Sequence, residues 1–292
     1  MSPVRKKKIV AFQGMRGAYS EQACRERLPE METLPCRTFD EVFAAVERGD
    51  AHMGMLPVEN STAGVISDSY DLLKTNRLHI VGEHYQRVRH CLLGMRGGTR
   101  EAIRVVCSHP QALAQCHQFL QRCGWEKRAV YDTAGAAAEL ARRGDPTEAA
   151  IASELCAGLY GLELLEREIQ DNRLNTTRFI LIAKEAVHPE AGVPCKTSLL
   201  FEARHIPAAL YKCLGGFATN GINLTKLEAR PIPGQNWTYH FYLDFQGRPD
   251  EPRRQLALEE LAFYTTSVKI LGCYPESPPV PDGEEEGGIA SD

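Results

Sequence analysis

The chain has 292 residues, of which 43% are hydrophobic and 25% are charged. These proportions are ordinary for globular proteins, and they exclude collagen-like, fully disordered and membrane-spanning chains. The net charge of −4 excludes a strongly basic surface, so nucleic acid is not an expected partner. Because domains of about 150 residues are common, this length predicts two domains.

The ten cysteines include no CxxC pair, and no apolar run is long enough for an export signal or a membrane helix. We therefore expect reduced thiols in a cytoplasmic protein that has no membrane partner. A zinc site needs closely spaced ligands on a turn, whereas Cys116 and His117 lie within a helical pattern. No metal site is predicted.

Residues 1–185 alternate short β-type runs with helical patterns, which is typical of an α/β architecture with largely parallel strands. Strands are predicted at 8–12, 53–57, 78–81, 90–93, 103–106, 149–152 and 178–183. The capping box Thr38–Glu41 predicts the start of a helix that Gly49 ends. The polar run Glu59–Gly64 predicts the start of another helix, which carries Val65 and Ile66.

Ser108–Gln111 forms a second predicted capping box, with proline in the first turn of its helix. Apolar residues spaced by three and four positions predict that this helix continues through Cys116 to Cys123 with one buried face. Asp132 and Thr133 predict the cap of an alanine-rich helix. Several such junctions lie at the carboxyl ends of strands, where helix N-termini favour anions, and together they predict a cleft for a small anion.

After an aperiodic stretch, the chain repeats a different pattern. Strands are predicted at 197–203, 222–229, 237–245 and 268–273, and helices at 208–220 and 252–264. This βαββαβ order is typical of a ferredoxin-like unit. The final residues are rich in proline and acidic side chains and are predicted to be disordered.

Three motifs resemble the signatures of prephenate dehydratase. They are Leu56–Ser61 (Leu-Pro-Val-Glu-Asn-Ser), Ser108–Cys116 (Ser-His-Pro-Gln-Ala-Leu-Ala-Gln-Cys) and Asn175–Phe179 (Asn-Thr-Thr-Arg-Phe). In the second unit, Gly221–Leu224 and Glu228–Pro231 are similar to the regulatory ACT domain of that family. The resemblance covers about residues 8–275.

The resemblance implies a lyase that decarboxylates and dehydrates prephenate to phenylpyruvate in phenylalanine biosynthesis. It implies a two-lobed catalytic domain, like a type II periplasmic binding protein, followed by a βαββαβ ACT domain. The predicted bounds are 1–185 for the catalytic domain, with its second lobe at about 85–165. A linker at 186–195, the ACT domain at 196–275 and a disordered tail at 276–292 follow.

The resemblance further implies that the enzyme needs no metal or organic cofactor, forms a homodimer or homotetramer and responds to L-phenylalanine. No chorismate mutase helices precede Lys8, so a monofunctional enzyme is expected. Two alternatives stay open, namely arogenate dehydratase and a non-catalytic amino-acid sensor on the same fold.

The difficult step is the loss of the ring hydroxyl, which needs a positioned acid or hydrogen-bond donor. The resemblance places Thr177 in this role, with Asn60 and Gln115 as amide donors. Glu59 is the alternative proton donor if burial raises its pKa, and otherwise bonds to backbone and contacts substrate.

The resemblance also assigns substrate-binding residues. Arg178 can hold a carboxylate through two hydrogen bonds. Alternate residues of a strand face opposite ways, however, so an ion pair between the lobes remains an alternative for Arg178. Phe179 belongs to the same motif. Ser20, Ser61 and Thr62 are candidate ligand contacts, with helix capping as their alternative role.

The effector residues expected by resemblance lie before the first helix of the second unit and along its second strand. They are Pro207, Ala208, Ala209, Leu210, Asn223, Leu224, Glu228, Arg230 and Pro231. Two positions depart from the family pattern, because Ala208 replaces a glycine and Ala229 replaces a serine. An added methyl can block close backbone approach and the lost hydroxyl removes a donor, so a unit used only for dimerisation is the alternative.

Overall fold

The computed structural model describes residues 7–232, 234 and 238–278, apart from the side chain of Ser67. These residues form two compact units. The first holds residues 7–69, 84–179 and 278, and the second holds 70–83, 180–232, 234 and 238–277. These units do not divide at residue 185, where the sequence predicts the end of the catalytic domain. Segments 70–83 and 180–185 belong instead to the same unit as the C-terminal part. The predicted domain bounds stay a prediction.

The first sheet has six strands in the order β2-β1-β3-β11-β5, with β4 paired to β3. The strands are β1 (Ile9–Gln13), β2 (Glu32–Cys36), β3 (Met53–Asn60), β4 (Gly64–Val65), β5 (His79–Arg87) and β11 (Thr176–Ala183). Its helices are α1 (Tyr19–Arg27), α2 (Phe39–Arg48) and α3 (Ser67–Thr75). Helix α2 begins with the predicted cap, since the Thr38 hydroxyl oxygen accepts from the Glu41 N–H at 3.2 Å.

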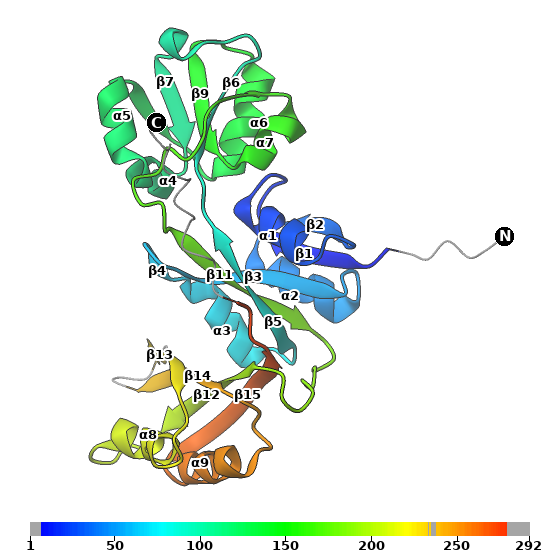
Figure 1. Cartoon of the computed structure of the whole chain (residues 1–292), viewed down its shortest axis with the longest axis vertical. Coiled ribbons are helices and arrows are strands. Elements are labelled where there is room, and N and C mark those ends of the chain that lie inside the picture. Colours follow the sequence, from blue (N-terminus) through cyan, green and yellow to red (C-terminus); the bar gives the residue numbers. More distant parts are fainter. Residues whose placement is uncertain (1–6, 233, 235–237, 279–292) are drawn as a thin grey trace, which may run out of the picture. The chain divides into compact units, whose positions relative to one another are not determined.

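The second sheet has five strands in the order β10-β6-β9-β7-β8. They are β6 (Cys91–Gly94), β7 (Val105–Ser108), β8 (Glu126–Ala129), β9 (Glu148–Ala152) and β10 (Glu163–Glu166), and the 3₁₀ helix η1 covers Arg100–Ala102. Helices α4 (Pro110–Gln115) and α5 (His117–Cys123) lie on one side, and α6 (Thr133–Arg143) and α7 (Glu154–Tyr160) on the other (Figure 1). Each side has its own buried apolar core.

The chain passes between these two sheets twice, after β5 and again between β10 and β11. Each sheet with its helices therefore forms one lobe. This arrangement confirms the predicted two-lobed α/β architecture. Among residues 7–232, 234 and 238–278, no helix combines the length and apolar character needed to span a bilayer.

The second unit contains a four-stranded antiparallel sheet in the order β13-β14-β12-β15. Its elements are β12 (Cys195–Ala203), α8 (Ala209–Thr219), β13 (Leu224–Pro231), β14 (Tyr239–Gln246), α9 (Pro252–Phe263) and β15 (Thr265–Pro275). Side chains of α8 and α9 pack with one face of the sheet in a shared core. The predicted βαββαβ order is confirmed. Trp237, the predicted start of its third strand, lies outside the described residues, as do residues 279–292 of the predicted tail.

The segment after β3 differs from the prediction. Strand β3 continues to Asn60, and Gly64–Val65 returns along it as β4, so the helix begins only at Ser67. The cause is the Asn60 side chain, whose Oδ1 accepts hydrogen bonds from the Thr62 and Ala63 N–H groups at 3.0 and 2.8 Å. These bonds fold the polar run into a turn instead of a helix start.

The predicted helix at 110–123 is also different, because it is broken at Cys116. Proline opens α4 as expected, but the cap is His109, whose Nδ1 accepts from the Gln111 N–H at 3.2 Å. The prediction that Ser108 caps this helix is wrong, since the Ser108 hydroxyl donates to the Ile151 carbonyl oxygen at 2.6 Å. Strands β2, β4, β8 and β10 are absent from the predicted elements.

Candidate active site

The ends of β3 and β11 place Asn60 and Thr177 side by side in the first lobe. The Asn60 Nδ2 group donates to Thr177 Oγ1 at 2.9 Å and to Asn175 Oδ1 at 2.8 Å. The two strand ends are also joined by the Ser61 N–H, which donates to the Thr176 carbonyl at 2.8 Å. Because Thr177 Oγ1 accepts from Asn60, the Thr177 hydroxyl proton can be directed to another acceptor.

Three side chains from different segments form a second series of hydrogen bonds. The Tyr19 hydroxyl lies 2.7 Å from His90 Nδ1, and His90 Nε2 lies 2.8 Å from Gln115 Oε1. Tyr19 opens α1, His90 directly precedes β6, and Gln115 ends α4. Burial raises the pKa of Tyr19 and lowers that of His90, so both side chains are neutral near pH 7.

These side chains share a cavity of about 180 Å³ between the two lobes of the first unit. It is lined by Tyr19, Ser20, Pro57, Asn60, Ile66, Val88, His90, His109, Gln111, Ala112, Gln115, Thr133, Thr177 and Phe179. The first turns of α1 and α6 contribute Tyr19, Ser20 and Thr133. Helix N-termini and neutral donors together favour a bound anion.

The structure thus brings five of the predicted residues to one cavity, namely Ser20, Asn60, Gln115, Thr177 and Phe179. Arg178 lies between two of them on β11, and the alternation of the strand turns it away from the lining. Glu59 is likewise adjacent to Asn60 on β3 and is half-buried outside the lining. The binding roles of Arg178 and Glu59 stay predictions.

Ser61 and Thr62 occupy the turn beside the cavity. The Ser61 Oγ accepts from the Thr176 N–H at 2.9 Å, which gives this side chain a structural role in joining the strands. Thr62 lines a neighbouring cavity together with Gln115 and Asn175. Their contacts with a ligand remain untested predictions.

Sequence reasoning missed several lining residues, of which His90, Tyr19 and His109 carry ionisable side chains. His109 and Thr133 stand at predicted helix starts, so their positions were visible in the pattern. His90 gave no comparable signal, because a single histidine before an apolar strand is common in protein cores. Among the described residues, no group of three Cys, His, Asp or Glu side chains could hold a metal ion.

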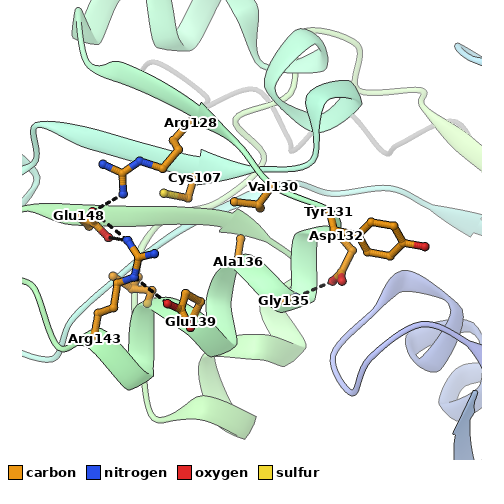
Figure 2. A pocket seen from close by; sticks show the side chains of 11 residues that line it. Cys107, Arg128, Val130, Tyr131, Asp132, Gly135, Ala136, Glu139, Arg143 and Glu148 are labelled. Carbon is orange, nitrogen blue, oxygen red and sulfur yellow. Dashed lines mark hydrogen bonds and ion pairs between the residues drawn. The ribbon is translucent and has the colours of Figure 1, made fainter. Parts of the chain in front are cut away.

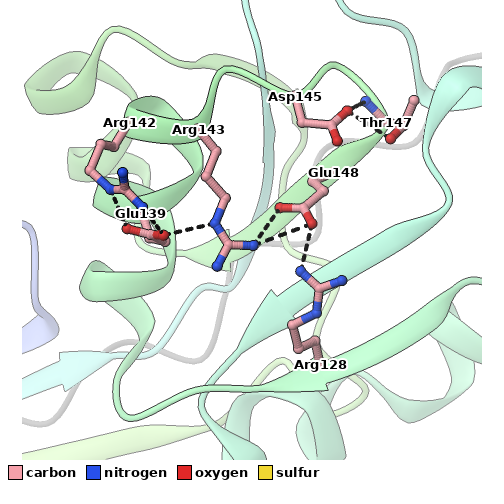
Figure 3. Close-up of polar contacts among 7 residues, drawn as sticks. All are labelled: Arg128, Glu139, Arg142, Arg143, Asp145, Thr147 and Glu148. Carbon is pink, nitrogen blue, oxygen red and sulfur yellow. Dashed lines mark hydrogen bonds and ion pairs between the residues drawn. The ribbon is translucent and has the colours of Figure 1, made fainter.

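A larger cavity of about 250 Å³ lies within the second lobe, away from the predicted residues (Figure 2). Its floor is apolar, and Glu148 lies at one end between Arg128 and Arg143. Figure 3 shows that these charges form a continuous network. Arg143 Nε contacts Glu139 Oε1 at 2.7 Å, and Arg128 Nη1 contacts Glu148 Oε1 at 2.5 Å.

Each charge in this network therefore has an opposite partner. Hydrogen bonds from Arg142 and Arg143 lower the pKa of Glu139 to about 2. The network joins the edge strand β8 and helix α6 to β9, which is a structural role. The smaller cavity between the lobes, and not this one, collects the residues that can carry out proton transfer.

The predicted effector residues lie in three segments of the second unit. Pro207, Ala208, Ala209 and Leu210 lie at the start of α8, whereas Asn223 and Leu224 follow its end. An 11-residue helix separates them by about 16 Å. Glu228, Arg230 and Pro231 lie further along β13, an edge strand of the sheet.

Comparison with known proteins shows what this chain is similar to. The family model described as prephenate dehydratase matches residues 10–187. A relative from Komagataeibacter europaeus, named bifunctional N-acyl-homoserine lactone acylase/prephenate dehydratase, is 44% identical over 272 residues, covering 93% of this chain and 97% of the relative. An Arabidopsis thaliana relative, named arogenate dehydratase/prephenate dehydratase 2, chloroplastic, is 44% identical and covers 91% of this chain and 72% of its own.

Among solved structures, the crystal structure of prephenate dehydratase from Arthrobacter aurescens in complex with L-Phe is similar to this one. Its TM-score is 0.85 at 28% sequence identity, and the match covers 93% of this chain and 92% of that chain.

Proposed function

The chain belongs to the prephenate dehydratase family, and from this premise we propose that it converts prephenate to phenylpyruvate, carbon dioxide and water at the cavity between the lobes. The observation that carries the proposal is the hydrogen bond from Asn60 to Thr177 in a cavity that also holds Gln115. These are the residues that the motifs Leu56–Ser61, Ser108–Cys116 and Asn175–Phe179 contribute.

The reaction breaks two bonds of prephenate. The bond between the ring and its carboxylate breaks to release carbon dioxide, and its electron pair completes the aromatic ring. The ring C–O bond breaks at the same time, and the leaving oxygen takes one proton to become water. Because aromatisation drives the electron flow, the enzyme has to supply mainly a proton or hydrogen-bond donor. Such a donor typically raises the reaction rate by a factor of about 10² to 10⁴.

In our proposal, the Thr177 hydroxyl supplies this donor. Its oxygen is held by Asn60, so its proton faces the leaving oxygen, and solvent restores the proton after each turnover. The Gln115 amide donates to the same oxygen. The carboxylates are held by hydroxyl donors and by the N-terminal turns of α1 and α6.

We also propose that L-phenylalanine regulates the enzyme at a seam between copies of the chain. Residues of the predicted site lie at opposite ends of α8, and the edge strand β13 exposes Leu227. Both features suit a site that two copies complete. Ala208 adopts φ +55°, in the region that favours glycine, so its methyl group occupies a position where the family pattern has none.

The deciding experiment incubates the purified chain with prephenate and follows phenylpyruvate by its absorbance in alkali. We expect turnover that does not require added metal or cofactor. Arogenate is assayed in parallel, and a large preference for it would replace prephenate as the substrate. An inert preparation that still binds phenylalanine would favour the sensor.

A second activity is assayed on the same preparation. The relative from Komagataeibacter europaeus carries an acylase name and matches along nearly its whole length. Release of homoserine lactone from an N-acyl-homoserine lactone would show that this chain has the acylase activity for which that relative is named. Size-exclusion chromatography with and without phenylalanine tests the proposed homo-oligomer and its response to the effector.

A further inference from the structure

His90 is the most thoroughly fixed histidine around the cavity. The residue is 2% exposed, and it lies in the segment that passes from the first lobe to the second. The backbone N–H of His90 donates to Gln170 Oε1 at 2.8 Å, and its backbone carbonyl oxygen accepts from the Ile169 N–H at 3.0 Å. The backbone and ring of His90 are therefore both held by partners from other segments.

The protonation of the ring follows from its neighbours. Desolvation lowers the pKa of His90, so the ring is neutral and carries one N–H. Gln115 presents its carbonyl oxygen Oε1 to His90 Nε2 at 2.8 Å, and this oxygen can only accept. The proton consequently lies on Nε2, and Nδ1 accepts from the Tyr19 hydroxyl at 2.7 Å.

Tyr19 could also donate to the Arg89 carbonyl oxygen, which lies 3.1 Å from its hydroxyl. A phenol has a single proton, and the shorter contact with His90 takes it. Hydrogen bonds thus run in one direction, from Tyr19 to His90 and from His90 to Gln115.

This direction determines what Gln115 offers to a ligand. Its Oε1 is occupied by His90, which leaves the two N–H bonds of its amide for the cavity. In the opposite orientation, Gln115 would present an acceptor to the leaving hydroxyl and could not stabilise it as it gains negative charge.

We propose that His90 is a positioning residue for the dehydration, because its ring, oriented by Tyr19, holds Gln115 with its amide N–H groups directed into the cavity that contains Thr177. The proposal rests on the proposed function, since it names how one donor of that reaction is oriented. Asn60 holds Thr177 in the same way, and each donor therefore has its own orienting side chain.

The first test compares two replacements of His90. His90→Gln keeps an N–H group near the position of Nε2, whereas His90→Leu removes it. We expect His90→Leu to lower kcat by about 10- to 100-fold with KM changed less than about threefold, because a donor to developing charge acts mainly in the transition state. His90→Gln should retain at least about a third of kcat, and His188→Leu, at an exposed site, is the matched control.

The second test separates positioning from a general loss of structure. In a Gln115→Met background, His90→Leu should lower kcat by no more than about twofold further, because residues acting through one group are not additive. An additional loss equal to that in the wild type would overturn the proposal. So would wild-type kcat in His90→Leu.

The third test reads the ring directly by ¹⁵N NMR of the histidine side chains. We expect the proton on Nε2 in the wild type and a shift of population toward Nδ1 in Tyr19→Phe, which should also lower kcat. A wild-type ring protonated on Nδ1 would contradict the inference even in an active enzyme. A wild-type chain that turns over neither prephenate nor arogenate would instead contradict the proposed function.

Discussion

Thr177 illustrates how a residue becomes reactive through its neighbour. A threonine hydroxyl at a strand start normally bonds to backbone, but Asn60 donates to this one and is itself fixed by the Thr62 and Ala63 N–H groups. The whole carboxamide of Asn60 is therefore committed, and its orientation cannot reverse without breaking several hydrogen bonds at once. Such fixed donors are the ones that stabilise developing charge best.

Replacing the hydroxyl of Thr177 should remove this donor with little change of shape. We expect Thr177→Val to lower kcat by about 10² or more, because general acid catalysis and hydrogen bonding to the leaving oxygen are both lost. Thr177→Ser should keep most of the activity. Steady-state kinetics and thermal unfolding of both variants check this, and normal turnover in Thr177→Val would remove Thr177 from the mechanism.

His90 should also make stability depend on pH. Burial lowers its pKa in the folded state, so below the ordinary pKa of about 6.5 the unfolded chain binds more protons than the folded one. Stability is present above that pH and is lost as the pH falls, by at most about 1.4 kcal/mol per pH unit for one group.

We therefore expect the melting temperature to fall between pH 7.5 and 5.5, and to fall less in His90→Gln. His188→Gln, at an exposed site, provides the comparison. Equal pH dependence in wild type and His90→Gln would show that the ring is not kept neutral by folding.

At the scale of elements, two interruptions decide the shape of the site. Strand β3 ends in a turn rather than a helix, which brings Asn60 to Thr177. The break at Cys116 ends α4 at Gln115, whose carbonyl oxygen accepts from the Asp171 N–H at 2.7 Å. The Asp171 carboxylate in turn accepts from the Gln118 N–H in the first turn of α5. The segment that contains Asp171 thus bonds to the end of α4 and caps the start of α5.

The turn before α1 joins the two lobes of the first unit. Gly17 has φ +91°, and its carbonyl oxygen accepts from the Ser153 hydroxyl at 2.5 Å, next to α7. A Cβ at this position would lie 2.5 Å from Cys156 Sγ. Position 17 therefore requires glycine for two reasons, namely its positive φ and the short distance between its backbone and Cys156.

Gly17→Ala should destabilise the protein by about 1–3 kcal/mol through strain and overpacking. Gly124→Ala is the matched control, because Gly124 also has a positive φ but a Cβ there would meet nothing within 4 Å. Thermal unfolding compares the two, at about 2–4 °C per kcal/mol for a chain of this size class. Equal losses would mean that the contact with Cys156 is unimportant.

At the scale of the whole molecule, the second unit includes segment 70–83, which residues 84–179 separate in sequence from the rest of the unit. Lys196 Nζ lies 2.9 Å from Glu83 Oε1, and both side chains are buried. Glu83 Oε1 also accepts from the Ser277 N–H at 3.1 Å. Lys269 Nζ donates to the Leu73 carbonyl oxygen at 2.9 Å, near the end of α3. Segment 70–83 is thus bound to the ferredoxin-like sheet by charged groups.

Removing one member of the buried pair should be costly. We expect Lys196→Met to destabilise the protein by about 3–5 kcal/mol, because the Glu83 carboxylate is left buried without its ammonium. The double variant Glu83→Gln/Lys196→Met should recover part of this loss, since no buried charge remains. Denaturant unfolding measures both, and a double variant less stable than Lys196→Met would contradict the explanation.

The sequence by itself determined the α/β class of the first part of the chain and the βαββαβ order of the second, because hydrophobic periodicity and caps such as Thr38 are local signals. The resemblance to prephenate dehydratase implied the two lobes. The sequence motifs also identified Asn60, Gln115 and Thr177. Tertiary structure decided that the helix breaks at Cys116 and that Tyr19 and His90 enter the lining of the cavity. These features depend on contacts between residues far apart in sequence, such as Asp171 with Gln118 and His90 with Gln115, and no local pattern encodes them.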